Sequence, residues 1–200
     1  MGFITPALPK PNSRRSLRCW PYIGMLLLTL LHGHADAEDK FRVETVSTHL
    51  RDHVYLLDAD IDFHFSDEAL EALNNGIPLT ISLEIEVQRN RRYWLDEDIA
   101  ELEQRYQIFY HALSGQFLVQ NQNSSATRIY PSLAATLVNL GRIRDLPLLD
   151  QKLIDPDEQY ELELRVRLDI EALPAPLRPL AYVSPAWRLA SDWYTWSLIH

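Results

Sequence analysis

Cysteine, methionine and glycine are scarce in this sequence, whose 200 residues include one cysteine, two methionines and six glycines. A single cysteine excludes a disulfide framework and a zinc site built from cysteines. Beyond residue 37 only Gly76, Gly115 and Gly141 remain, and each stands at an expected turn or helix end. The sequence therefore has no glycine-rich loop of the kind that cradles phosphate groups.

Basic residues are outnumbered, because 19 Lys and Arg stand against 28 Asp and Glu, a net charge of −9. A nucleic-acid-binding surface needs clustered basic side chains that neutralise phosphates. We therefore expect no nucleic-acid partner.

Residues 1–37 have the three parts of a secretory signal peptide. A basic segment at residues 10–18 precedes an apolar run at residues 22–31, and Ala35, Asp36 and Ala37 form a small-x-small cleavage pattern. The cut would follow Ala37, so that the mature chain begins at Glu38. A membrane span needs roughly 20 apolar residues, about twice the length of this run. We expect export to the periplasm of a Gram-negative bacterium and no stable span after cleavage; the alternative is a membrane anchor formed by an uncleaved N-terminus.

Cleavage after Ala37 leaves residues 38–200 as a single domain with a net charge of −12, because it removes four of the 19 basic residues and one of the 28 acidic ones. It also removes the only cysteine and both methionines, so the mature chain has no thiol nucleophile.

Three segments alternate apolar and polar residues with a period of two, at residues 58–65, 79–88 and 161–170. Such alternation indicates strands with one face in a core and one in water, which is typical of antiparallel sheets. The fold class is therefore predicted as mainly β, an antiparallel β-sandwich with two short helices. The alternative is an α+β fold with a single antiparallel sheet.

Other elements follow from turn and cap signals. Shorter strands are expected at 41–49, 105–113 and 116–122, with a turn at Ser114 and Gly115, and helices at 67–74 and 132–140. Residues 94–104 fit either a helix or a bent strand. Residues 174–185 carry four prolines and predict a stiff extended crossing rather than a helix, and residues 187–199 predict a final strand.

Five segments resemble the exported proteobacterial family called domain of unknown function 4390. They are EALNNGIPLTISLEIEV at 71–87, RRYWLDEDIAELEQRYQIFYHALSGQFLVQ at 91–120, GRIRDLPL at 141–148, ALPAPLRP at 172–179 and SDWYTW at 191–196. The resemblance implies an envelope protein of unknown biochemical role, and a membrane partner such as a sensor histidine kinase. It supplies no catalytic residue.

An acidic row, Asp58, Asp60 and Asp62, continues into His64 and provides the candidate metal ligands. Three acids at alternate positions resemble the start of a calcium loop, but Phe63 stands where that loop needs glycine and Ala69 where it needs glutamate. The alternative is a strand face paired with opposite charges, for which Arg165 and Arg167 are the expected partners. No two-histidine metal motif and no serine elbow of hydrolases is present. We therefore predict no metal, cofactor or catalytic residue.

Four large aromatic residues lie close together near the C-terminus: Trp187, Trp193, Tyr194 and Trp196. In a continuous strand, Trp187 and Trp193 would share one face, with Tyr194 and Trp196 on the other. Aromatic residues dominate both cores and binding hot spots, so one face is a candidate partner-binding surface.

The function expected from these observations is a non-catalytic binding or accessory module, with an envelope or inner-membrane protein as its partner. The alternative is a metal-dependent or hydrolytic enzyme that uses Asp58, Asp60, Asp62 and His64.

Overall fold

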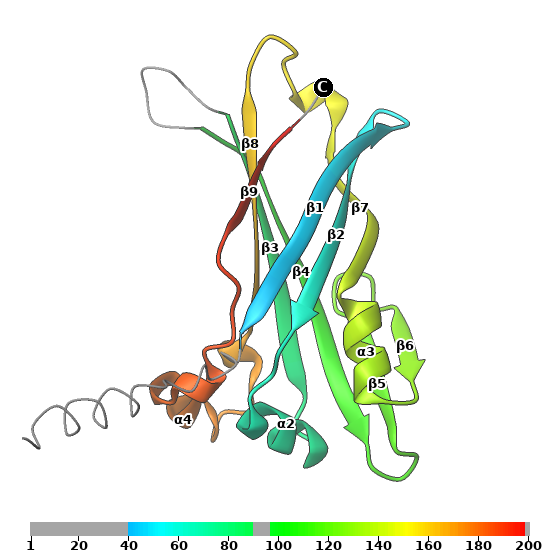
Figure 1. Ribbon diagram of the computed structural model, residues 1–200, viewed down its shortest axis with the longest axis vertical. Helices are drawn as coiled ribbons and strands as arrows, with labels where there is room; N and C mark the ends of the chain where they lie inside the picture. The colour runs from blue at the N-terminus through cyan, green and yellow to red at the C-terminus, as the bar shows by residue number, and fades with distance from the viewer. Residues whose placement is uncertain (1–39, 90–96, 199–200) are drawn as a thin grey trace, which may run out of the picture. The chain divides into compact units, whose positions relative to one another are not determined.

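The structure, a computed structural model, describes residues 40–89 and 97–198 (Figure 1). Nine strands and three short α-helices account for most of them. The elements in chain order are β1 (Phe41–Arg51), β2 (Val54–Phe63), α2 (Asp67–Asn74), β3 (Leu79–Arg89), β4 (Glu97–His111), β5 (Gln116–Asn121), β6 (Thr127–Tyr130), α3 (Leu133–Leu140), β7 (Arg142–Asp150), η1 (Gln151–Leu153), β8 (Tyr160–Leu168), η2 (Ile170–Ala172), α4 (Arg178–Val183), η3 (Pro185–Trp187) and β9 (Tyr194–Ser197).

The strands form two antiparallel sheets. The smaller has the order β1-β2-β7 and the larger the order β6-β5-β4-β3-β8-β9. Figure 1 shows the three-stranded sheet lying across one face of the six-stranded sheet. The prediction of a mainly β fold with two packed antiparallel sheets is confirmed.

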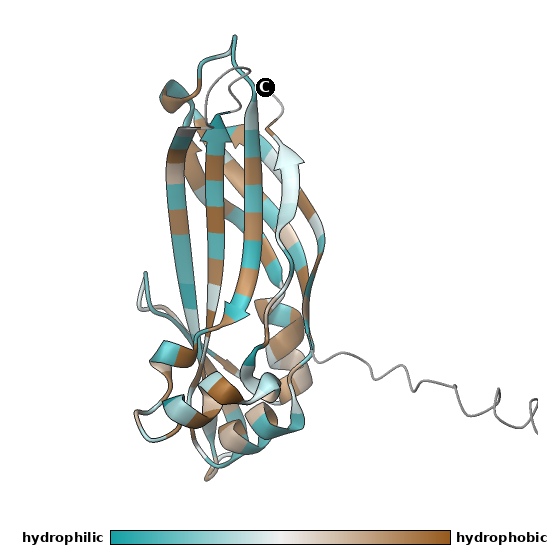
Figure 2. Cartoon of the chain, turned by 90° about the vertical axis from the view of Figure 1, so that its left-hand side faces the viewer, coloured by the Kyte–Doolittle hydropathy of each residue, from teal (hydrophilic) through white to brown (hydrophobic). Residues whose placement is uncertain are grey.

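Period-two alternation produces this packing. In β3 the buried residues Ile81, Leu83 and Ile85 alternate with polar residues, and β8 alternates in register beside it. Figure 2 shows the resulting bands of apolar and polar residues along the strands. The apolar faces of both sheets enclose one main core, which also contains Leu57 and Ala59 of β2.

Serine residues cap the first two helices. The hydroxyl of Ser66 accepts from the Ala69 N–H at 3.2 Å, and that of Ser132 accepts from the Ala135 N–H at 3.2 Å. Each bond satisfies an N–H group that the first helical turn would otherwise leave unpaired. The helices predicted at 67–74 and 132–140 are thereby confirmed to within one residue.

The β4–β5 hairpin settles one ambiguity. β4 pairs with β5 across the turn that contains Ser114 and Gly115, as expected, and begins at Glu97. From Glu97 onward the helical interpretation of residues 94–104 is wrong; residues 94–96 lie outside the described ranges.

Two strands, β6 and β7, were not predicted. β6 has four residues. β7 contains Pro147 and two register shifts against β2, which disrupt its alternation. A proline is tolerated there because β7 lies at the edge of its sheet, where one side needs no N–H partner.

The expectation for the C-terminal region is wrong in two places. Residues 174–185 are not an extended crossing, because they include the helix α4, with Pro179 in its first turn. That position needs no backbone N–H donor, so proline fits. Residues 187–199 are not one strand either: Trp187 belongs to η3, and regular pairing with β8 spans only Tyr194–Ser197.

Within the described ranges, none of the helices combines the length and the apolar content that crossing a lipid bilayer requires.

Candidate functional site

Asp58 of the acidic row stabilises a β-bulge. Between the pairs Leu57–Leu146 and Ala59–Ile143, β7 has two residues opposite one of β2. The second of them, Asp145, has φ of 53°. Its backbone N–H donates to the Asp58 carboxylate at 2.8 Å. Asp58 therefore supplies the acceptor that the interrupted ladder lacks.

Asp60 fixes the other bulge residue. The Arg144 guanidinium donates to the Asp60 carboxylate at 2.6 Å, and to the carbonyls of Ala59 and Ile143 at 2.8 and 2.7 Å. The hydrogen bond from Arg144, joined by a weaker one from Thr45, lowers the pKa of Asp60. Asp60 is thus an ionised acceptor for a nearby arginine.

The end of the row is more open. Asp62 lies 3.6 Å from His64, and both side chains are about half exposed. The expected partners Arg165 and Arg167 do not face this row, because they lie on β8 of the other sheet. Arg167 pairs with Glu84, and Arg165 lies over the Trp193 ring at 5.7 Å. That part of the prediction is wrong because the strand order places β7, not β8, beside β2.

The surroundings of the acidic row do not complete a set of metal ligands among the described residues. Among residues 40–89 and 97–198, no three His, Cys, Asp or Glu side chains are arranged to hold a metal ion.

The C-terminal aromatic residues occupy different environments. Trp187 is buried in the main core, and Trp196 and Tyr194 share the inward face of β9 beside Leu162 and Leu164. Trp193 remains 38% exposed on the opposite face. The expected pairing of Trp187 with Trp193 on one strand face is wrong, because the strand does not extend back to Trp187.

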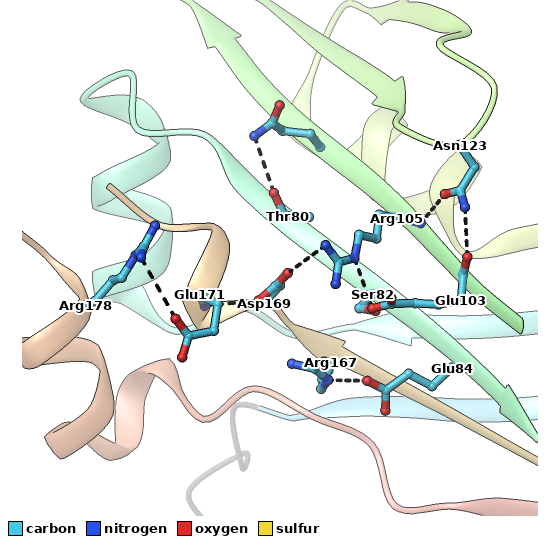
Figure 3. A network of polar contacts seen from close by, with 11 residues as sticks. Thr80, Ser82, Glu84, Glu103, Arg105, Asn123, Arg167, Asp169, Glu171 and Arg178 are labelled. Carbon is cyan, nitrogen blue, oxygen red and sulfur yellow. Dashed lines mark hydrogen bonds and ion pairs between the residues drawn. The ribbon is translucent and has the colours of Figure 1, made fainter. Parts of the chain in front are cut away.

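The outward face of the six-stranded sheet carries a closed polar network (Figure 3). The Ser82 hydroxyl and the Arg105 guanidinium both donate to Glu103, at 2.6 and 3.0 Å. These contacts, with the Ser82 hydrogen bond the larger, lower the pKa of Glu103. Arg105 also faces the buried Asp169 at 3.9 Å. Every charged group of this network is paired with a group of opposite charge, so none of them is left available for a ligand. The network is therefore a structural feature of the sheet.

A cleft of about 220 Å³ opens elsewhere, between β7 of the small sheet and β4–β6 of the large one, beside α3. Thirteen residues from these elements and their connections line it: Tyr106, Val119, Asn121, Ser124, Ala126, Arg128, Tyr130, Asn139, Leu140, Arg142, Ile143, Arg144 and Leu146. Polar, cationic and aromatic side chains from segments distant in sequence converge here. Convergence of polar groups in a concavity is the general mark of a ligand site.

The charge of the cleft is of one sign. Its charged lining residues are Arg128, Arg142 and Arg144, and no acid lines it. The Arg144 guanidinium is paired with Asp60, whereas the side chains of Arg128 and Arg142 make no hydrogen bond or ion pair with any described residue. Arg142 stands opposite Asp60 in the β2–β7 ladder, and its charge helps to lower the pKa of Asp60. The cleft is therefore a cationic spot on an acidic chain.

Tyr106 forms part of the cleft wall as a neutral phenol. Burial raises its pKa, against the opposing effects of a hydrogen bond with Asn121 and the positive charge of Arg128. Its hydroxyl therefore stays protonated at neutral pH and can donate a hydrogen bond.

Sequence reasoning missed this cleft. Arg142 and Arg144 lie in a segment quoted only for family resemblance, and Arg128 and Tyr130 lie in a strand that was not predicted. The two arginines in RIR at 142–144 were the available signal for a cationic site. The residues that line the opposite side of the cleft lie on β4, β5 and β6 of the other sheet, and no local pattern places them there.

The comparisons with known proteins agree with the resemblance. No curated protein and no solved structure matches the chain. The family described as Domain of unknown function (DUF4390) matches residues 38–197, nearly the whole chain beyond the signal-like segment. The chain therefore belongs to the DUF4390 family.

Proposed function

We propose that the chain is an exported, non-catalytic binding module that receives a ligand, or a side chain of a partner protein, in the cleft between its sheets. The observation that carries this proposal is the convergence of arginine, tyrosine and asparagine side chains on one concavity. Tyrosine and arginine are, with tryptophan, the residues enriched at binding hot spots.

Export is part of the proposal. Residues 1–37 have the composition of a signal peptide, and the family match begins at Glu38, immediately after the proposed cut. The module would act in the periplasm. Its partner would be an envelope or inner-membrane protein, such as the extracytoplasmic part of a sensor histidine kinase.

Catalysis by the acidic row is not favoured. Asp58 and Asp60 accept hydrogen bonds from Asp145 and Arg144, which hold the bulge of β7. A general base or metal ligand needs a carboxylate directed at a substrate site. These two carboxylates instead accept hydrogen bonds from the neighbouring strand of their own sheet.

The experiment is site-specific photo-crosslinking in intact cells. A photoreactive residue replaces Asn139, which lines the cleft, or in a matched control Leu113, which is 96% exposed in the β4–β5 turn. We expect a defined adduct from position 139 and not from position 113. The same adduct from both positions, or none from position 139 when the protein is present in the periplasm, would contradict the binding of a protein partner in the cleft.

A further inference from the structure

We infer that the cleft is an oxyanion site, in which Arg128 and Arg142 bind a carboxylate or phosphate group of the ligand. The inference rests on the proposed function, because it names the chemistry of the group that the cleft receives.

The first argument is the pairing of arginines. In residues 40–89 and 97–198, every arginine except Arg128 and Arg142 has a hydrogen bond, an ion pair or an aromatic contact. The two exceptions line the same cleft. In a chain with nine more acidic than basic residues, carboxylates are abundant as partners. The two exposed arginine side chains, neither hydrogen-bonded nor ion-paired, line one concavity and are therefore available to an external anion.

The second argument is their placement. Arg128 lies on β6 of the six-stranded sheet, and Arg142 lies on β7 of the three-stranded sheet. The cleft thus has a cationic donor from each sheet. A guanidinium group presents parallel N–H donors that match the two oxygens of a carboxylate or phosphate.

Arg144 adds a third, fixed positive charge to the cleft. Its N–H groups are used by Asp60 and two backbone carbonyls, so its guanidinium is held in place next to the cleft. Asp60, which also stands opposite Arg142 in the β2–β7 ladder, balances the charge of one of the three arginines, so the cleft keeps an excess of positive charge.

Neutral polar groups also line the cleft, although the Asn139 amide already donates to the Ala135 carbonyl and the Tyr106 hydroxyl already bonds with Asn121. Tyr106, Tyr130 and Asn139 line the same cleft and carry hydroxyl or amide groups. The cleft volume of about 220 Å³ is below the roughly 300–1,000 Å³ typical of pockets that enclose a drug-sized ligand. We therefore expect it to hold a small anion or the charged end of a larger ligand, with the remainder outside.

The test is an NMR titration of the ¹⁵N-labelled mature chain, residues 38–200, with inorganic phosphate and separately with succinate, at constant ionic strength. We expect saturable shifts confined to the cleft, for example at Asn121 and Ile143. The anion with the lower Kd identifies whether the site prefers phosphate or carboxylate.

The variants are Arg128→Gln and Arg142→Gln, with Arg42→Gln as the control on β1. Each cleft variant removes one charge-assisted contact and should raise Kd about tenfold, while the control leaves it unchanged. Arg128→Lys, which keeps the charge but not the paired donors, should lie in between. Because neither cleft arginine side chain makes a hydrogen bond or ion pair with a described residue, nearly unchanged melting temperatures are expected.

Shifts that do not saturate, or a Kd unaffected by both cleft variants, would overturn the inference. So would an equal loss in the Arg42→Gln control. The outcomes separate the two proposals: a cleft-specific crosslink without anion binding refutes the oxyanion site alone, whereas anion binding without a crosslink refutes the binding of a protein partner.

Discussion

At the scale of single residues, the acidic row shows how one sequence pattern serves a structural purpose. Alternate acids on a strand repel one another unless donors face them. Here Asp58 and Asp60 meet the two residues of a bulge, a backbone N–H and a guanidinium. The pattern that resembles a calcium loop is thus explained by the bulge of β7.

Replacing these acids separately tests that explanation. Asp60→Asn should lower the free energy of unfolding by about 1 kcal/mol, because it removes the charge that Arg144 pairs with at a partly exposed position. The matched change Asp62→Asn should have almost no effect, since its neighbour is a half-exposed histidine. Chemical denaturation measures both; equal losses would contradict the special role of Asp60.

Glu86 is a second informative residue. It stands directly opposite Glu101 and Glu163 on the outward face of the six-stranded sheet. Burial, together with the charges of Glu163, Glu101 and Asp98, raises its pKa. Three glutamates in one row destabilise the sheet as long as they are ionised.

Glu86→Gln should therefore raise the free energy of unfolding at neutral pH by about 0.5 kcal/mol. Folding raises the pKa of Glu86 above its ordinary value of 4.5. The repulsion between ionised glutamates therefore lowers stability fully at pH values above the folded-state pKa. This destabilisation disappears at pH values below 4.5, where Glu86 is protonated in both states. The stabilisation should accordingly vanish when unfolding is measured at pH 4 or below. A gain that persists there would show that charge repulsion is not its cause.

At the scale of elements, backbone approaches backbone closely at the junction of α3 and β7. The Ile61 N–H donates to the Gly141 carbonyl at 2.9 Å. A Cβ on Gly141 would lie 2.1 Å from the Ile61 carbonyl oxygen. The φ of Gly141 is −71°, which any residue adopts, so close approach is the reason for glycine.

Gly141→Ala should destabilise the domain by about 3 kcal/mol, because backbone must move to relieve the overlap. The control is Gly115→Ala, where φ is 65° but no atom lies within 4 Å of the added carbon. It should cost about 1 kcal/mol through backbone strain alone. Thermal melting of both variants checks the order, and a smaller loss at position 141 would contradict the steric account.

The segment beyond Pro185 also belongs to the core. Trp187, Leu189 and Leu198 are buried, and the Ser191 hydroxyl accepts from the Val166 N–H at 3.0 Å. The segment therefore contributes buried side chains to the core although most of its backbone is not a regular strand.

A chain that ends at Pro185 should fail to unfold cooperatively. Deleting a large buried aromatic residue costs about 3–5 kcal/mol, against a total stability of about 5–15 kcal/mol. The test compares the cooperativity and melting temperature of this chain with those of a control that ends at Leu198, both measured by circular dichroism. A truncated chain that melts as high as the control would show that the segment is an appendage.

At the scale of the whole molecule, charge is distributed unevenly. The chain is acidic, its outward sheet face carries both a paired network and a glutamate row, and its cleft is cationic. Net negative charge repels anionic surfaces, whereas a local positive cleft attracts an anionic group.

Export can be tested on the intact protein. We expect the chain in the envelope fraction to begin at Glu38, because the apolar run is too short to span a bilayer and ends at a cleavage pattern. N-terminal sequencing after fractionation measures this. Detection of Met1 in that fraction would favour the uncleaved anchor.

The amino-acid sequence by itself determined the local features. Alternation marked β2, β3 and β8, serine caps marked α2 and α3, and five segments indicated the family. These signals are readable because burial of one strand face and capping of a helix depend on residues within a few positions of each other.

The tertiary structure alone decided which charges meet. Asp60 pairs with Arg144, 84 residues away, and not with the arginines of β8. The cleft arises because β6 and β7, from different sheets, lie on either side of it. The reason is physical: strand order and register across two sheets depend on packing between segments distant in sequence, and no local pattern encodes the side chains that such packing brings together.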